Sequence, residues 1–155
     1  MMTTKPPFSE GVIAQMRQLA AKRTDPKNFD KMIAEIAGDQ TPTEIYANGW
    51  VWMAGPVGEF KCYPQGEHYY YDRYLVGEGA GPIRAEKATL WTSQRSWGAF
   101  FNNCESATVA GIAEDGGALG AIWYDDSELP IGTFYGLADG LAEFEAECFG
   151  GWYNN

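Results

Sequence analysis

The chain has 155 residues, a formal net charge of −10 and a high aromatic content of 15%. This length fits one domain, which can bury about two-thirds of its unfolded surface without disulfides or a structural metal. The acidic balance disfavours direct nucleic-acid binding, and no apolar run is long enough for a signal peptide or a membrane-spanning helix. Three widely spaced cysteines are typical of reduced thiols, so we expect a cytoplasmic protein without membrane contact.

The charge is unevenly distributed along the chain. Residues 1–95 contain 11 basic and 11 acidic residues, whereas residues 96–155 contain ten acids and no Lys or Arg. A surface of one sign repels nucleic acid and speeds encounter with a basic partner. Acidic proteins are also common and soluble, and net charge says nothing about fold. The asymmetry nevertheless favours a protein partner with a basic surface.

Two amphipathic helices are predicted within residues 1–38. Ser9 is suited to cap the first, which carries apolar residues at helical spacing up to residue 20. Thr24 or Asp25 caps the second, Pro26 occupies its first turn, and Gly38 ends it. We expect the pair to form a helical hairpin that buries its apolar stripe on a sheet.

Short aromatic-rich runs between turn residues predict an antiparallel meander of about six to seven strands over residues 44–125. Asp115-Gly116-Gly117 signals a hairpin, and the glycine-rich stretch Gly77–Gly81 favours a mobile loop. The predicted strands are Trp50–Met53, Glu59–Tyr63, Tyr69–Val76, Ala85–Thr92, Trp97–Phe101, Ala107–Ala113 and Leu119–Tyr124.

Residues 137–149 return to helical spacing, with Leu137, Leu141, Phe144 and Cys148 on one face. The acids near the end of this predicted helix oppose its dipole and are locally unfavourable. The predicted fold class is therefore α+β in a single domain, residues 1–155. It comprises an N-terminal helical hairpin (1–38), an antiparallel sheet (44–125) and a C-terminal helix (137–149).

The residue types that support a reaction are few. His68 is the only histidine, no serine lies in a G-x-S-x-G elbow, and the cysteines do not have zinc-ligand spacing. The acids between residues 114 and 128 lack the alternation of a calcium loop and are interpreted as turn residues. We therefore predict no catalytic residue, no metal and no cofactor. A glycosidase-type carboxylate pair stays open, because among 21 acids some pair always lies at a suitable distance.

Large rings beside carboxylates form the candidate partner-binding surface. Such rings occur in Tyr71-Asp72-Arg73-Tyr74 and Trp123-Tyr124-Asp125-Asp126, where acids would steer a basic partner. Strand alternation would equally turn some of these rings into the core. The predicted partner-binding residues are Tyr71, Asp72, Tyr74, Glu114, Asp115, Trp123, Tyr124, Asp125, Asp126 and Glu128.

Several short segments together resemble SUKH-type bacterial immunity proteins. They are Ile33–Gly38 with Pro42 and Asn48-Gly49, then Asp115-Gly116-Gly117, Asp125-Asp126 and Leu137–Phe144. The resemblance implies a helix–sheet–helix order and a small acidic cytoplasmic protein that binds and neutralises a toxin.

The leading functional hypothesis is a non-enzymatic acidic binding or inhibitor protein of immunity or anti-defence type. It would engage a basic partner surface, and a variant of the hypothesis is nucleic-acid mimicry, in which carboxylates imitate phosphates. One alternative is a small-molecule-binding protein or hydrolase with an aromatic-lined pocket in the sheet, using groups such as His68, Asp72 or Glu86. Another is a structural component of a phage or other assembly.

Overall fold

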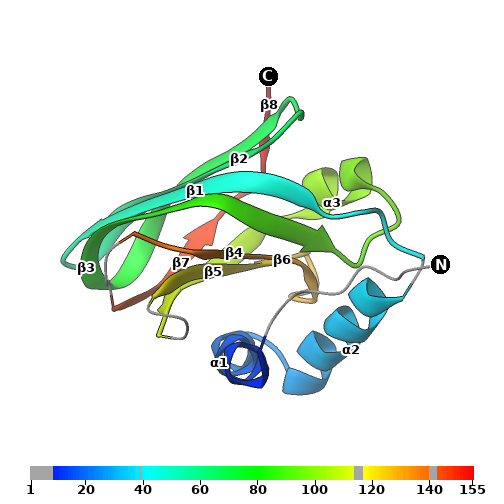
Figure 1. Ribbon diagram of the computed structural model, residues 1–155, viewed down its shortest axis with the longest axis horizontal. Coiled ribbons are helices and arrows are strands. Elements are labelled where there is room, and N and C mark those ends of the chain that lie inside the picture. Colours follow the sequence, from blue (N-terminus) through cyan, green and yellow to red (C-terminus); the bar gives the residue numbers. More distant parts are fainter. Residues whose placement is uncertain (1–8, 39, 114–116, 140–142) are drawn as a thin grey trace.

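A computed structural model describes residues 9–38, 40–113, 117–139 and 143–155. Within these ranges the strands form an eight-stranded antiparallel sheet that closes into a barrel, accompanied by three helices (Figure 1). The elements are α1 (Glu10–Ala21), α2 (Pro26–Ala37), β1 (Ile45–Ala54), β2 (Val57–Pro64), β3 (Tyr69–Thr92), α3 (Trp97–Asn103), β4 (Ser106–Ile112), β5 (Ala118–Tyr124), β6 (Pro130–Leu137), β7 (Phe144–Phe149) and β8 (Tyr153–Asn154).

The barrel closes because the long strand β3 takes part in two walls. Its first part pairs with β2 and then with β7, and its second part pairs with β1 and β6. Strands β4 and β5 complete the circle between β7 and β6. Gly77 and Gly79 permit the transition, because a Cβ at either position would lie only 2.6 Å from a Cα atom of β7. The segment Gly77–Gly81, predicted as a mobile loop, is therefore continuous strand.

Burial divides the barrel into a wall covered on both sides and a wall covered on one side. Side chains of β4, β5 and β6 are buried along almost the whole strand, whereas burial alternates along β1, β2 and β7. The inward side chains of the barrel form one core, which contains Phe60, Tyr71, Trp123 and Phe134. A second core joins α1 and α2 to outward side chains of β4, β5 and β6. Figure 1 shows these helices on the side of β5 and β6, away from β1 and β2.

The fold class predicted from the sequence is wrong in three respects. The strands close into a barrel rather than an open meander carrying a helical hairpin, although α1 and α2 do form with Ser9 and Asp25 as their N-caps. The segment Trp97–Phe101 was expected to be a strand but begins α3, where the Ser96 side chain accepts a hydrogen bond from the Ala99 amide.

The third error is the C-terminal helix. Strand β6 extends to Leu137, and Phe144–Phe149 form β7, whose side chains at Phe144, Ala146 and Cys148 are buried. Leu141, which belonged to the predicted apolar stripe, lies outside the described residues, as do residues 114–116 of the predicted hairpin turn.

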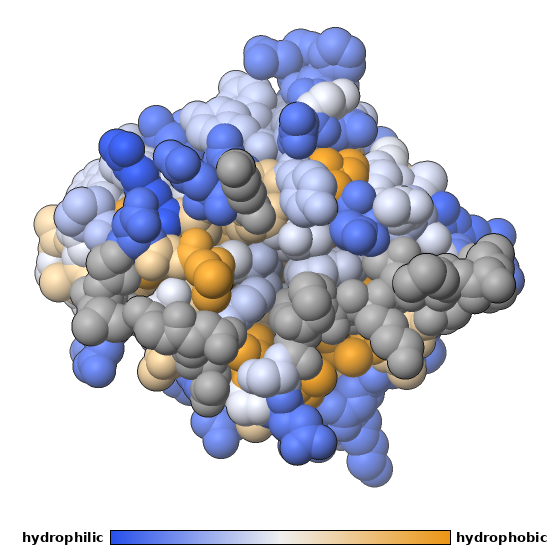
Figure 2. Space-filling model, viewed as in Figure 1, coloured by the Kyte–Doolittle hydropathy of each residue, from blue (hydrophilic) through white to orange (hydrophobic). Residues whose placement is uncertain are grey.

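The surface seen in Figure 2 is covered mainly by hydrophilic side chains, with hydrophobic ones in small separate places. Among the described helices, none has the length and apolar character that a membrane crossing requires. Exposed aromatic rings occur on the strands that the helices leave uncovered, where Tyr46 is 60%, Tyr63 47% and Tyr74 79% exposed. The uncovered wall of the barrel is therefore also the one that presents rings to solvent.

Candidate functional site

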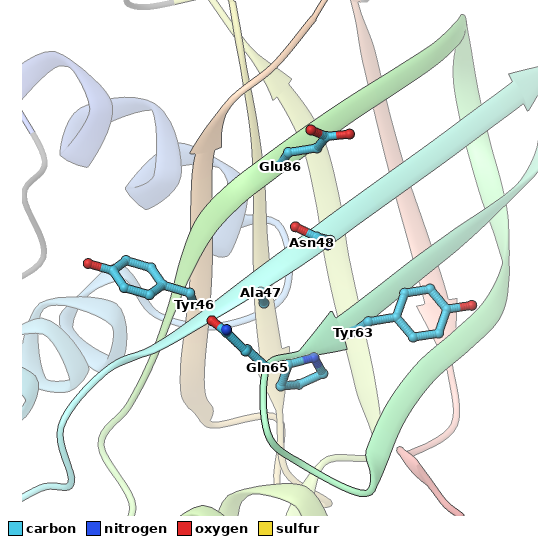
Figure 3. A pocket seen from close by; sticks show the side chains of 7 residues that line it. Tyr46, Ala47, Asn48, Tyr63, Gln65 and Glu86 are labelled. Atoms are coloured by element: carbon cyan, nitrogen blue, oxygen red, sulfur yellow. The ribbon is translucent and has the colours of Figure 1, made fainter.

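Two adjoining depressions lie on the outer face of β1, β2 and β3, and together they are called the outer groove. The larger has a volume of about 980 Å³ and the smaller about 380 Å³. Both are lined by Asn48, Tyr63 and Glu86. The larger adds Tyr46, Ala47, Pro64 and Gln65, and the smaller adds Gly49, Trp50, Lys61 and Arg84. In Figure 3, Tyr46 and Tyr63 lie on opposite sides of the larger depression, with Asn48 and Glu86 between them.

The alternation of β1 explains why rings face outward here. Ala47, Val51 and Met53 are buried in the barrel, so the residues between them point to the other face of the strand. Trp50 and Trp52 are consequently only half-buried and lie outside both hydrophobic cores. Tryptophan on the solvent side of a strand gives up core burial, and such rings are typical anchors of binding surfaces.

A β-bulge in β3 shapes the groove beside Asn48. Between the pairs Ala47/Ala88 and Gly49/Ala85, β1 advances by two residues and β3 by three. The extra residue on β3 resets its alternation, so that Ala85 and Ala88 both face the barrel and Glu86 lies exposed between them. Bulges are enriched next to functional sites because they redirect a side chain. Here the bulge places a carboxylate in the lining of the groove.

Two cations flank the Trp50 ring. Register places Lys61 of β2 and Arg84 of β3 directly opposite Trp50 on its two sides. The Lys61 Nζ atom lies 5.4 Å from the ring centroid, a cation–π distance, and 4.0 Å from the Glu59 carboxylate. The Arg84 side chain is exposed and makes no hydrogen bond or ion pair with the described part of the chain. Its guanidinium is therefore available to a ligand.

A ladder of tyrosines supports the other side of the groove. The Tyr63 ring stacks on Tyr70 with centroids 6.3 Å apart, and Tyr70 stacks on Tyr153 of β8 at 5.4 Å. The Arg73 guanidinium lies 4.3 Å from the Tyr153 ring centroid and donates a hydrogen bond to the Gly151 carbonyl. Tyr63 is therefore supported by a neighbouring ring, which lowers the entropy cost of binding a ligand against it.

Glu59 and Asp72 form a hydrogen-bonded carboxyl pair at the edge of the groove. Burial and the hydrogen bond with Glu59 raise the pKa of Asp72 to about 6. The same hydrogen bond lowers the pKa of Glu59, assisted by the Trp52 indole, which donates to Glu59 Oε1 at 3.0 Å. Two carboxyls in direct hydrogen-bond contact lie closer than the roughly 5 Å that retaining glycosidases need around a scissile bond. This pair therefore has the geometry of a shared proton and not of a hydrolytic site.

The predicted partner-binding residues do not come together at one place. Tyr71, Trp123 and Tyr124 are fully buried and offer no surface to a partner. Tyr74 is exposed and Asp72 is half-buried, both on β3 beside the outer groove. The β5–β6 turn and its ends contain Asp125, Asp126 and Glu128. The remaining two predicted residues, Glu114 and Asp115, lie outside the described residues.

Cations near the end of α1 neutralise several of the C-terminal acids within the molecule. Arg23 donates to both oxygens of Glu128, at 2.8 and 2.9 Å, and to Glu147 at 3.3 Å. Lys22 forms an ion pair with Glu145. Asp125 is also engaged, because its carboxylate accepts hydrogen bonds from two backbone amides of its own turn. The sharp asymmetry of charge along the chain is therefore partly cancelled by the fold.

Sequence reasoning missed most residues of the groove. Glu86 was named as a polar group of an aromatic-lined pocket in the sheet, but Trp50 and Tyr63 were assigned only to strands. The pattern Trp50-Val51-Trp52 carried the signal, because a strand that buries the valine must expose both indoles to the opposite face. Which face would be covered by helices depends on the closure of the barrel, which the sequence pattern did not reveal.

Comparison with solved structures identifies the fold. The barrel is similar to that of VapD. This virulence-associated protein from the intracellular pathogen Rhodococcus equi superposes with a TM-score of 0.63 at 17% identity, over 72% of this chain and 97% of VapD. VapB from the same organism gives a TM-score of 0.58 at 19% identity, over 73% of this chain and 98% of VapB. At these identities the likeness concerns the fold alone. No family model and no curated protein sequence matches the chain.

Proposed function

We propose that this chain is a non-enzymatic binding protein whose recognition surface is the outer groove. The observation that carries the proposal is the outward placement of Trp50 between Lys61 and Arg84, within a depression that Tyr63 borders. Aromatic rings and arginine are the residue types that dominate binding energy at recognition surfaces. The groove combines both on a barrel wall that the helices leave open.

The arrangement supports binding better than catalysis. The titratable pair nearest the groove, Glu59 and Asp72, shares a hydrogen bond and leaves no room for a substrate bond between the two carboxyls. Of the groups suggested for a catalytic pocket, only Glu86 lines the groove, while His68 lies outside its lining. The lining holds a single carboxylate among amides, cations and rings, a set of groups suited to orienting a ligand.

An inhibitor of immunity or anti-defence type that engages a basic partner is the second candidate. The exposed Asp126 in the β5–β6 turn favours it, because this carboxylate forms no ion pair within the described residues. Its neighbour Glu128 is already paired with Arg23, which weakens the field that such a partner would meet. The outer groove therefore has stronger support than the acidic turn.

A screen of immobilised ligand classes with matched variants tests the proposal. The panel contains basic peptides, acidic peptides and oligosaccharides, and the proteins are wild type, Trp50→Ala, Tyr63→Ala and the control Tyr74→Ala. Tyr74 is a suitable control because it is exposed on the same wall but does not line the groove. Thermal melts establish that each variant is folded.

We expect one class to bind wild type and Tyr74→Ala, and to bind the groove variants about tenfold or more weakly, as hot-spot rings do. Equal binding by all four proteins, chemical turnover of a bound ligand, or no binding to any class would overturn the proposal. Binding of basic peptides that Asp126→Lys abolishes and the groove variants retain would replace it with the second candidate.

A further inference from the structure

We propose that the ligand of the outer groove is a neutral oligosaccharide. This inference rests on the proposed function, since it names the ligand class for the same surface. It follows from three properties of the groove: the position of its rings, its mixture of hydrogen-bonding groups and its nearly balanced charge.

Three aromatic side chains line the groove, namely Tyr46, Trp50 and Tyr63. Tyr46 and Trp50 are separated by four residues of β1, which corresponds to about 13 Å at the rise of a strand. Tyr63 lies opposite Asn48, between them, on the neighbouring strand. A row of this length is longer than one sugar ring, so it fits a chain of sugars. The apolar C–H face of a sugar can pack on a Tyr or Trp face while its hydroxyls reach the polar rim.

The polar lining contains both donors and acceptors. Asn48 and Gln65 provide amides, Glu86 provides an acceptor, and Lys61 and Arg84 provide donors. A sugar hydroxyl is donor and acceptor at once, so it can pair with groups of either kind. An apolar ligand would desolvate the charged groups without compensation, which is unfavourable.

The charge balance of the groove selects against strongly charged ligands. The lining contains the carboxylate of Glu86 as well as the guanidinium of Arg84, and Lys61 lies 4.0 Å from Glu59, so neither sign of charge dominates. A polyanion would need a surplus of cations to replace its counterions, and a basic peptide would meet Lys61 and Arg84 beside the Trp50 ring. An uncharged ligand with many hydroxyls is the class that this lining matches.

Titration of the full chain with defined oligosaccharides tests the inference. Neutral hexasaccharides of glucose, mannose, galactose and N-acetylglucosamine are compared with a hexasaccharide of uronic acids, hexalysine and hexaglutamate. Isothermal calorimetry gives the dissociation constant, and quenching of tryptophan fluorescence reports contact with the half-buried indoles.

We expect at least one neutral hexasaccharide to bind with a Kd between about 10 µM and 1 mM, as suits an open site. Its affinity should change less than about twofold between 50 and 500 mM NaCl, because no charge is exchanged. Trp50→Ala and Tyr63→Ala should each weaken it about tenfold or more, and Glu86→Gln by a smaller factor, while Tyr74→Ala leaves it unchanged.

The possible failures separate the inference from the proposed function. If only the uronic acid oligomer or a peptide binds, and the groove variants abolish that binding, the oligosaccharide inference is wrong and the binding function stands. If no ligand binds, or if a neutral sugar binds equally to wild type and both groove variants, the outer groove is not a recognition surface and both proposals fall.

Discussion

Replacing Arg23 with methionine should lower the free energy of unfolding by about 2–3 kcal/mol. The Arg23 side chain is only 10% exposed, and its guanidinium forms an ion pair with Glu128. It also donates a hydrogen bond to the Ser106 hydroxyl at 2.8 Å and lies 4.8 Å from the centroid of the Tyr124 ring. Glu128 is 53% exposed, so solvent limits its ion pair to about 1 kcal/mol. Loss of the charged partner of the buried Ser106 hydroxyl and loss of the cation–π contact should each lower the unfolding free energy by about 1 kcal/mol.

Denaturant unfolding at pH 7 measures this loss, and Arg17→Met provides the control. Arg17 pairs with Asp30 on the helix surface, where both side chains are about half exposed, so its replacement should cost less than about 0.5 kcal/mol. A double-mutant cycle with Glu128→Gln should give a coupling free energy of about 1 kcal/mol. If Arg23→Met costs no more than Arg17→Met, the contacts of Arg23 with Glu128, Ser106 and Tyr124 do not stabilise the fold.

The pH dependence of the same pair provides an independent check. The hydrogen bond from Arg23 lowers the pKa of Glu128 below its ordinary value of 4.5. The unfolded chain therefore binds a proton that the native state has released, and stability rises with pH through this range. The contribution is present above about pH 4.5 and is lost as the pH falls through the lower, native pKa. In Arg23→Met this part of the acid destabilisation should disappear.

Three further substitutions probe the barrel. Wild type should lose stability as the pH rises from about 4 to 6, because the raised pKa of Asp72 makes the native state bind a proton more tightly than the unfolded chain does. Asp72→Asn should abolish this loss, and denaturant midpoints at pH 4 and 7 measure it. Tyr71→Phe should cost about 1–2 kcal/mol in urea unfolding, since the buried hydroxyl donates to a backbone carbonyl at 2.9 Å, and a neutral result would refute this. Gly132→Ala should lower the unfolding free energy by about 1–3 kcal/mol, because the new Cβ would overlap the Phe100 ring, whereas an unchanged thermal midpoint would show that the ring moves freely.

Local patterns predicted the positions of many elements but not how they assemble. Ser9 and Asp25 cap the helices that the spacing indicated, because capping and amphipathic spacing are local properties. Strand β6 was not predicted, and the closure of the barrel depends on pairings between residues far apart in the chain, such as Val76 with Glu147. A pattern of alternation cannot specify such partners.

The C-terminal helix shows how one segment can satisfy two periodicities. Phe144 and Cys148 are four residues apart, which suits one face of a helix, but with Ala146 they also alternate with Glu143, Glu145 and Glu147. The alternation is the pattern that the structure follows, and it removes the conflict of these acids with a helix dipole. The candidate site failed for a related reason: the rings chosen at Tyr71 and Trp123 face inward, whereas Trp50 faces outward.

The dual role of β3 also determines the order in which the protein can be completed during synthesis. The strands β1, β2 and β3 can pair once residue 92 has left the ribosome, and α1 and α2 can dock once β4, β5 and β6 have followed. Until β7 (Phe144–Phe149) has been made, however, the β3 segment at Gly77–Gly79 and the free edge of β4 both lack β7, the strand with which they pair. A nascent chain that stalls before residue 144 would therefore expose two unpaired strand edges, each a template for association with another chain.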